Sequence, residues 1–485
     1  MPNASPYLPE ARFASLGPEF ADPVSPAEFP EAIPRFWNRR WAERVGLGDL
    51  DDTGRAAHFA RFEPLPGAQP RPLAMRYHGH QFRSYNPELG DGRGFLFAQL
   101  RDDHGRLLDL GTKGSGKTPY SRTADGRLTL KGGVREVLAA SMLEALGVPT
   151  SKAFALYETG EQLVRGDEPS PTRSAVLTRL SYSHIRFGTF QRHAFHERAD
   201  LISALTDHVI GTYYPALAGL EGEARAPALL TALIGRTARM TARWMAAGFV
   251  HGVLNTDNMN LTGESFDYGP YRFLPRNDPG FTAAYFDSTG LYAFGRQPEA
   301  VFWNLQRLAA ALTLISPVDP LIEALNGYAP AYRDALAEAM VLRLGLKRAG
   351  REAEIELAEA GFRALAEGGE TLRWEPFFFD WFGGLASEAR ALDGPRAALY
   401  QAPAFRAFCE RLAGFEPDRA ERLADPYFSR PEPEELLYDE IERLWAAIAD
   451  ADDWAPFQAK LARIEQARVA FAVDPRLEDG TGAAG

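Results

Sequence analysis

The segment from His251 to Asn258, followed nine residues later by Asp267, carries side chains that could hold a metal ion and phosphate groups. Asn258 and Asp267 offer hard oxygen ligands, which Mg²⁺ and Mn²⁺ prefer when they bridge phosphates. Asp257 is the carboxylate beside them that could act as a general base or orient a hydroxyl group. A polar loop that caps a strand would explain any one of these residues, but it explains poorly the whole set in this order. The segment therefore predicts a metal site for a phosphate-bearing substrate.

The spacing of this segment is that of a protein-kinase catalytic loop from which the usual base is missing. A kinase loop runs H-R-D-x-x-x-x-N and is followed by D-F-G. When the histidine is aligned on His251, Asn258 and Asp267 fall on the two metal ligands, but Val253 falls on the catalytic aspartate. The sequence therefore predicts a chain that holds a nucleotide and its metal ion without ordinary kinase chemistry.

A lysine and a glutamate upstream could complete such a site. Lys113 ends a predicted strand, and residues 133–146 predict a helix that is apolar almost all round, which is typical of a buried helix. Glu136 on that helix needs a partner, because a buried unpaired carboxylate is costly. The kinase order of strand lysine and helix glutamate favours Lys113 as this partner. The alternative is a solvated glutamate that the helix dipole stabilises near the helix start.

Other residues could contact phosphates. Gly90-Asp-Gly92-Arg93-Gly94 precedes a predicted strand, so its backbone N–H groups and the Arg93 guanidinium could reach phosphate oxygens. Taken alone, a cluster of glycine and aspartate before a strand is more often a plain turn. Arg179 and Arg186 could also bind phosphates, or they could form surface salt bridges. The residues alone leave both alternatives open.

A second stretch matches a different phosphate-binding motif. Residues 111–118 fit the P-loop pattern G-x-x-x-x-G-K-[ST] letter for letter. That motif needs a helix to open directly after its lysine, so that the helix N-terminus meets the phosphates. Here Asp125-Gly126 soon breaks the run after Lys117. We therefore expect Lys113, rather than Lys117, to serve the nucleotide.

The bulk composition limits the class of protein. A chain of 485 residues exceeds the roughly 250–300 residues at which a single core stops growing. The net charge of −12 disfavours nucleic acid or an anionic membrane as a partner. Cys409 is the single cysteine, so we expect no intrachain disulfide and a reducing compartment. Residues 1–20 do not resemble a secretory signal, and no apolar run is long enough to predict a membrane-spanning helix, so a cytoplasmic protein is expected.

The elements that must position these residues predict an α+β, bilobed protein-kinase-like fold with N-terminal and C-terminal helical extensions. Short strands, one helix and more strands are typical of a kinase N-lobe, and long helical segments follow. The predicted strands are 94–100, 106–110, 152–157 and 174–180, and the helical regions are 36–45, 133–146, 200–249 and about 298–472. The predicted parts are an extension over 1–75, an N-lobe over 76–180, a C-lobe with the metal site over 181–315 and a helical region over 316–485.

These motifs together resemble the selenoprotein O family of kinase-like proteins, in its bacterial branch without selenocysteine. The resemblance runs from about Met75 to Leu314, and the spacing between the motifs also agrees. The motifs that carry it are Gly90–Arg93, Lys113–Gly116, Arg135-Glu136, Ser183–Gly188, His251–Asn258, Phe266–Gly269, Gln297-Pro298 and Trp303–Leu305.

The resemblance implies a protein adenylyltransferase, which binds ATP flipped relative to kinases and transfers AMP to Ser, Thr or Tyr hydroxyls of proteins with release of pyrophosphate. Uridylyl transfer from UTP is also attributed to bacterial members. The resemblance further implies Mg²⁺ or Mn²⁺ held by Asn258 and Asp267, with Asp257 as proton acceptor. The implied nucleotide contacts are Gly90, Gly92, Arg93, Lys113, Asp125, Gly126, Arg179 and Arg186, with Glu136 paired to Lys113.

Two departures from the family and two alternative functions accompany this prediction. The chain lacks the C-terminal cysteine of many bacterial members, so redox control is not expected. Residues 281–290 lack the Asn-His run of the family, which bears on how the lobe below the metal site is built. The alternatives are an inactive nucleotide-binding pseudokinase scaffold and an atypical protein kinase.

Overall fold

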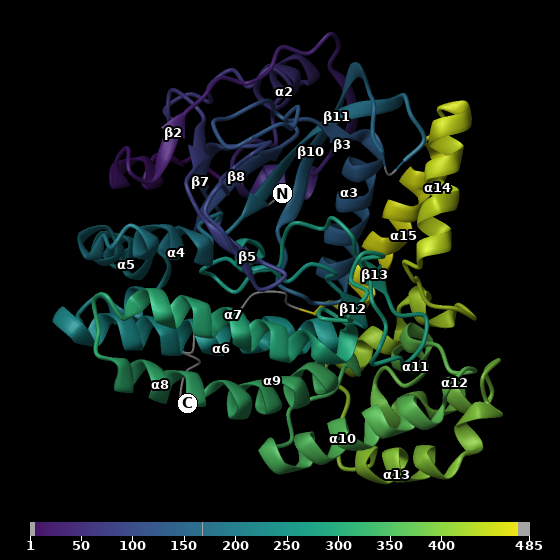
Figure 1. Ribbon diagram of the computed structural model, residues 1–485. Helices are drawn as coiled ribbons and strands as arrows, with labels where there is room; N and C mark the ends of the chain where they lie inside the picture. The colour runs from purple at the N-terminus through teal and green to yellow at the C-terminus, as the bar shows by residue number, and fades with distance from the viewer. Residues whose placement is uncertain (1–4, 167, 474–485) are drawn as a thin grey trace.

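A large antiparallel sheet and a mainly helical remainder make up the computed structural model, which describes residues 5–166 and 168–473 (Figure 1). The sheet has nine strands in the order β2-β4-β7-β8-β11-β10-β3, with β1 beside β7 and β9 beside β11. The chain thus combines helices with an antiparallel sheet, in agreement with the predicted class. The strands are β1 Pro9–Glu10, β2 Ala21–Pro23, β3 Ile33–Trp37, β4 Leu73–Met75, β7 Leu96–Arg101, β8 Leu107–Lys113, β9 Leu128–Thr129, β10 Lys152–Leu163 and β11 Thr172–Ser181.

The first 75 residues differ from the predicted helical extension, because they supply four strands of the same sheet as well as α1 (Arg39–Arg44) and α2 (Asp52–Phe59). Phe36 and Trp37, predicted to be helical, lie in β3, which pairs with β10 at the edge of the sheet. Proline-rich strands that lie at an edge give little sequence signal, because they need not alternate strictly between polar and apolar residues. The four-part division of the chain remains a prediction.

Both faces of the sheet are covered. Successive residues of a strand point to opposite faces, and Val176 and Leu177 of β11 accordingly belong to different cores. Val176 packs with α1 and α2 residues such as Trp41 and Phe59, whereas Leu177 packs with the apolar side of α3. A sheet covered in this way holds β8 and β11 rigidly, and these two strands carry predicted site residues.

Helix α3 (Leu130–Ala145) is the predicted buried helix and begins three residues earlier than expected. Its N-cap is Thr129, whose side chain accepts a hydrogen bond from the backbone N–H of Gly132. Gly147 ends the helix with a φ of +77°, a conformation that costs glycine little. Glu136 is buried on this helix and projects toward the end of β8.

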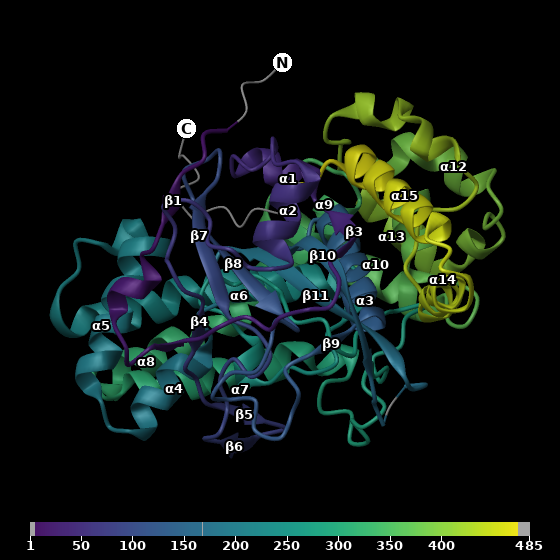
Figure 2. The ribbon, with the colours of Figure 1, turned by 90° about the horizontal axis from the view of Figure 1, so that it is seen from above.

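The helical part lies below the sheet in Figure 1 and returns to it at the C-terminal end, where α14 and α15 run beside α3 in Figures 1 and 2. None of the helices described is long and apolar enough to cross a membrane. The helices are α4 Phe187–Phe195, α5 Ala199–Tyr213, α6 Arg225–Ala246, α7 Gln297–Leu312, α8 Val318–Asn326, α9 Tyr328–Arg343, α10 Arg351–Glu367, α11 Trp374–Asp380, α12 Glu388–Leu392, α13 Pro403–Leu412, α14 Tyr438–Ala451 and α15 Ala455–Phe471.

Candidate functional site

A cavity of about 370 Å³ opens at the ends of β7 and β8, above the segment that carries Asp267. Its lining combines polar and apolar residues, as is common for sites that bind small molecules. Its lining includes the predicted residues Gly90, Gly92, Arg93, Lys113, Arg179, Arg186 and Asp267.

Asp267 is the centre of an ion-pair network in this cavity. One of its oxygens, Oδ1, lies 2.7 Å from Lys113 Nζ and 2.9 Å from Arg179 Nη1. The other, Oδ2, lies 3.2 Å from Arg186 Nη1. Lys113 also contacts the Glu136 carboxylate, so the predicted pair is present and the lysine joins two carboxylates.

Strand and helix ends bring these groups together. Lys113 is the last residue of β8, Arg179 lies on the neighbouring β11, and Arg186 directly precedes α4. Asp267 has a φ of +70°, a left-handed conformation that is uncommon for residues other than glycine. Such strain is found where the surrounding structure fixes a functional side chain.

The electrostatics of the network keep Asp267 ionised. Burial alone would raise the pKa of its carboxyl, but the charges of Lys113, Arg179 and Arg186 lower it well below the ordinary aspartate value. A carboxylate that stays charged while buried is suited to bind a metal ion, provided that the cations around it find other anions.

Asp257 lies on the other side of Arg186, whose Nη1 donates a hydrogen bond of 2.6 Å to the Asp257 backbone oxygen. Its side-chain oxygen Oδ1 is buried and has no hydrogen-bond partner among the described residues. Burial raises the pKa of Asp257 to about 6, although the charge of Arg186 opposes the rise. An unpartnered carboxylate oxygen of this kind is able to accept the proton of a bound hydroxyl group.

The catalytic-loop segment is held by hydrogen bonds from its flanks. His251 Nε2 lies 2.9 Å from the Phe266 backbone oxygen, which ties the loop to the residue directly before Asp267. From α7, the Gln297 side chain accepts a hydrogen bond from the His251 backbone N–H, and Asn304 donates to the Leu254 backbone oxygen at 2.8 Å. The motifs around Gln297 and Asn304 therefore support the loop rather than line the cavity.

The amide nitrogen of Asn258 is used in a hydrogen bond, whereas its amide oxygen is available to bind a ligand. Its Nδ2 donates a hydrogen bond of 2.9 Å to the Val253 backbone oxygen, and Oδ1 has no hydrogen-bond partner among the residues that the structure describes, so it is available as a ligand atom. Within residues 5–166 and 168–473 there is no cluster of three or more His, Cys, Asp or Glu side chains that could hold a metal ion by themselves. This donor set nevertheless fits Mg²⁺ or Mn²⁺, which commonly take one or two protein oxygens together with substrate phosphates.

The glycine-containing segment at residues 90–94 is backed by a second segment, residues 118–121. A Cβ atom at Gly90 would collide with the ring of Tyr120, whose hydroxyl group donates to Asp22. Thr118 and Ser121 donate hydrogen bonds to the backbone oxygens of Asp91 and Gly92. The close approach of the two segments explains why glycine is required at Gly90.

The P-loop alternative is contradicted by the structure. No helix follows Lys117, because a turn-rich stretch runs from Thr118 to Arg127 and the next helix is α3. The Lys117 side chain is exposed and does not belong to the cavity lining. Thr118, the last residue of the motif, donates its hydroxyl to the Asp91 backbone oxygen and so supports the glycine segment.

Two predicted nucleotide contacts lie outside the cavity lining. Asp125 forms a salt bridge of 2.8 Å with Arg165, and Gly126 accepts a backbone hydrogen bond of 3.1 Å from Gly116. Ala124, next to them, does line the cavity. The geometry thus gives no support for a direct contact of Asp125 or Gly126 with the ligand.

The structure adds residues that the sequence reasoning missed. Asp91 lies 3.5 Å from Arg186, and burial raises the pKa of its carboxyl against the opposing charge of that arginine. The Arg186 guanidinium also lies over the rings of Tyr77 and Phe266, at 4.6 Å and 4.9 Å from their centroids. Asp91 lies between two predicted glycines, so the sequence could have indicated it. No local pattern indicates Tyr77, which is far from Arg186 in sequence.

Residues 281–290, which lack the expected Asn-His run, form turns below the metal site. The Asp287 carboxylate accepts hydrogen bonds from the backbone N–H groups of Leu291 and Tyr292, at 2.9 Å and 2.8 Å. The Tyr292 hydroxyl then donates to Asn255 Oδ1 at 2.8 Å, which connects this segment to the catalytic loop.

Comparison with known proteins gives consistent matches over almost the whole chain. The family model described as "Protein adenylyltransferase SelO" matches residues 7–465. A protein nucleotidyltransferase YdiU from Synechocystis sp. is 44% identical over 474 residues, which cover 94% of this chain and 97% of the relative. The corresponding protein of Gloeobacter violaceus is 45% identical over 465 residues, with coverage of 94% and 95%. That of Synechococcus elongatus is 52% identical over 353 residues, with coverage of 72% and 70%.

Proposed function

The chain belongs to the protein adenylyltransferase SelO family and is a protein nucleotidyltransferase, and from this premise we propose that it transfers AMP from ATP to Ser, Thr or Tyr hydroxyls of proteins and releases pyrophosphate. The observation that carries the proposal is the Asp267 network, in which three cations surround one ionised carboxylate beside the unpartnered Asp257. UTP as an alternative donor is part of the same proposal.

The residues divide the reaction between them as follows. Asp257 accepts the proton of the acceptor hydroxyl group, and the oxygen of that hydroxyl group attacks the α-phosphorus. The bond from the α-phosphorus to the oxygen that bridges it to the β-phosphorus then breaks. Pyrophosphate leaves with the charge that develops on it, and Arg179 and Arg186 are placed to stabilise that charge. Lys113, held by Glu136, binds a phosphate group and keeps the ligand oriented.

A divalent ion, Mg²⁺ or Mn²⁺, would be held by Asp267 and the Asn258 amide oxygen together with the phosphates. When bound, it supplies positive charge that polarises the phosphoryl group under attack. The three cations that contact Asp267 would then turn to the phosphate oxygens, whose charge replaces that of the carboxylate.

The kinase-like fold belongs to this proposal as well. The order of lysine strand, glutamate helix, catalytic loop and Asp267 supports it, as does the contact of Lys113 with Glu136. Val253 at the position of the kinase base supports nucleotidyl transfer over the atypical-kinase alternative. We also propose a cytoplasmic location, because the proposed reaction needs ATP.

Replacement of Asp257 by asparagine tests the proposed base. The side chain keeps its shape but loses the proton acceptor, so transfer should fall by about 10²–10⁴-fold while the affinity for ATP stays within a few-fold of wild type. Transfer is measured by mass spectrometry of AMP-modified hydroxyls on the chain itself. Asp278→Asn, on an exposed aspartate of the same region, is the matched control and should keep full activity. Unchanged transfer in Asp257→Asn would remove Asp257 from the mechanism, and loss of ATP binding would assign it a different role.

A further inference from the structure

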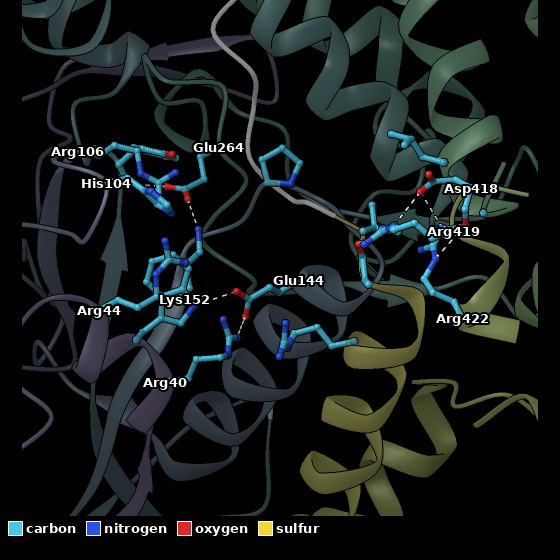
Figure 3. Close-up of a pocket in the computed structure, with 18 of the residues that line it drawn as sticks. Arg40, Arg44, His104, Arg106, Glu144, Lys152, Glu264, Asp418, Arg419 and Arg422 are labelled. Carbon is cyan, nitrogen blue, oxygen red and sulfur yellow. Dashed lines mark hydrogen bonds and ion pairs between the residues drawn. The ribbon is translucent and has the colours of Figure 1, made fainter. Parts of the chain in front are cut away.

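A second cavity, of about 600 Å³, lies away from the nucleotide cavity, between the sheet and the C-terminal region (Figure 3). One wall comes from α1, the β7–β8 turn, the end of α3 and the start of β10. The other wall comes from residues 342–346, residues 418–422 and the end of α15. Among the residues described, none lines both cavities, so this is a separate site.

The lining of this cavity is basic, although the whole chain carries a net charge of −12. Seven arginine and lysine side chains line it, against three carboxylates, and His104 adds a further polar group. Three more carboxylates pair with lining cations from just outside, namely Asp102, Asp103 and Glu465. The positive charge is therefore partly balanced, and an excess remains on the cavity side.

The first wall gathers cations around one aromatic ring. Lys152 Nζ lies 5.0 Å and the Arg44 guanidinium 4.2 Å from the centroid of the Trp41 ring. Lys152 is buried and forms a salt bridge of 2.6 Å with Glu264, and Arg40 forms one with Glu144. The negative face of the ring offsets part of the repulsion between these cations, so the cations can lie close together on this wall.

The second wall has two guanidinium groups for one carboxylate. Arg419 and Arg422 lie 3.2 Å and 3.0 Å from the same Asp418 oxygen, and Arg419 also donates to the Ala472 backbone oxygen at 3.0 Å. Burial and the neighbouring Arg419 lower the pKa of Arg422, while the charges of Asp418 and Glu421 oppose the shift. Figure 3 shows these arginines facing Arg40 and Lys152 across the cavity.

We propose that this cavity binds a small molecule that carries one or more phosphate groups. Its volume falls within the range of about 300–1,000 Å³ that is typical of small-molecule sites. Arginine side chains on both walls present the planar forks that match phosphate oxygens in bidentate pairs. An anion placed between the walls would supply the charge that Asp418 alone does not give to Arg419 and Arg422, whereas a metal cation would meet repulsion from both sides.

The test uses inorganic tripolyphosphate as the probe in isothermal titration calorimetry on the full-length protein. Two sites per chain are expected, one in the nucleotide cavity and one in this basic cavity, and Lys113→Ala should weaken only the first, because Lys113 lines only the nucleotide cavity. The variant R419Q/R468Q takes one charge from each of two lining segments, and Arg419 is chosen because its side chain is 49% exposed. It should weaken the second site by about tenfold or more, since each charge-assisted contact contributes more than about 1.4 kcal/mol.

The matched control is R333Q/R411Q, which removes the same charge from arginines that are 60% and 56% exposed on α9 and α13, away from the cavity. This control should keep both sites. Both double variants should bind ATP with wild-type affinity, which reports that they are folded. If R419Q/R468Q proves unstable, R419Q alone should still weaken the second site. A single site per chain in the wild type, or a second site unaffected in R419Q/R468Q and R419Q, would overturn the proposal.

Discussion

At the scale of single residues, the site depends on one lysine that contacts two carboxylates. Lys113 is buried beneath the cavity and contacts Glu136 and Asp267, which come from α3 and from the segment after the catalytic loop. The helix glutamate fixes the lysine, and the lysine in turn helps to hold Asp267 ionised. The proton state of the proposed metal ligand is thus set by a contact across the two parts of the fold.

Two lysines four residues apart allow this role to be tested against the P-loop alternative. Lys113→Ala should lower the affinity for ATP by about tenfold or more, because it removes a charge-assisted contact and leaves Glu136 without its cation. Lys117→Ala should change the affinity less than about twofold, since its side chain is exposed outside the cavity. Binding is measured by calorimetry, with a thermal unfolding curve for each variant. Loss of binding in Lys117→Ala with normal binding in Lys113→Ala would reverse the assignment.

The sequence predicts the local part of this site better than the distant part. The contact of Lys113 with Glu136 follows from a strand end and a buried helix, both of which have clear periodic patterns. The convergence of Arg179 and Arg186 on Asp267 depends on how β11 and α4 pack against the helical part, which spacing alone does not fix. A nucleotide contact of Asp125 stays a prediction, and the pairing of its side chain with Arg165 on a different loop carried no signal in the sequence.

At the scale of elements, the glycine segment 90–94 and the segment 118–121 form one unit. The ring of Tyr120 lies against Gly90, and its hydroxyl group is held by Asp22, which forms a bidentate pair with Arg76. The backbone that faces the ligand is therefore positioned by residues from three separate parts of the sheet region. The sequence indicated the glycines but not the residues that they pack against. The P-loop pattern, which ends at Thr118, gave no sign that residues 118–121 support the glycine segment.

This packing predicts the effect of adding one methyl group. Gly90→Ala should raise the KM for ATP by about tenfold, because the new Cβ would meet the Tyr120 ring and displace the segment from the phosphates. The effect on thermal stability should be smaller than that on KM. Gly235→Ala, on α6, meets nothing within 4 Å and is the control that should leave KM unchanged. An unaltered KM in Gly90→Ala would mean that this backbone does not touch the nucleotide.

At the scale of the whole molecule, the C-terminal helices are joined to the sheet region by charged contacts. Lys131 of α3 lies 2.7 Å from Glu442 of α14, and the buried Lys460 of α15 contacts Glu434 and Glu440. The sequence predicted a helical region that packs on the core from its apolar periodicity alone, and the contact of α15 with α3 agrees with that expectation. The contact of Lys131 with Glu442 and those of the buried Lys460 within the C-terminal region carry no periodic signal and were not predicted.

Another carboxylate of the C-terminal region, Glu435, makes the stability of the whole chain depend on pH. Burial raises the pKa of Glu435 to about 7, against the opposing charge of Arg373, and its side chain is only 12% exposed. The folded state therefore holds this proton more tightly than the unfolded state, so the stabilisation is complete below about pH 4.5 and is lost as pH rises toward 7.

Replacement of Glu435 by glutamine should remove that dependence. The variant should gain about 2 kcal/mol over wild type at pH 8 and less than about 1 kcal/mol at pH 5, as measured by chemical unfolding at both values. Glu416→Gln, on a glutamate whose side chain is 78% exposed, is the control and should show no such difference between the two pH values. Equal effects of Glu435→Gln at pH 5 and pH 8 would mean that this carboxyl group does not titrate in the folded state.

The central claim is that this chain transfers a nucleotidyl group rather than the γ-phosphate, and parallel labelling tests it most directly. The protein is incubated with Mg²⁺ or Mn²⁺ and with ATP labelled at either the α- or the γ-phosphate, and its own modification is resolved on a denaturing gel. The account predicts label on the protein from the α position only, and loss of that label in Asp267→Ala. Label from the γ position alone would contradict it, because that result would identify a kinase and would show that Val253 at the position of the usual base does not prevent phosphoryl transfer.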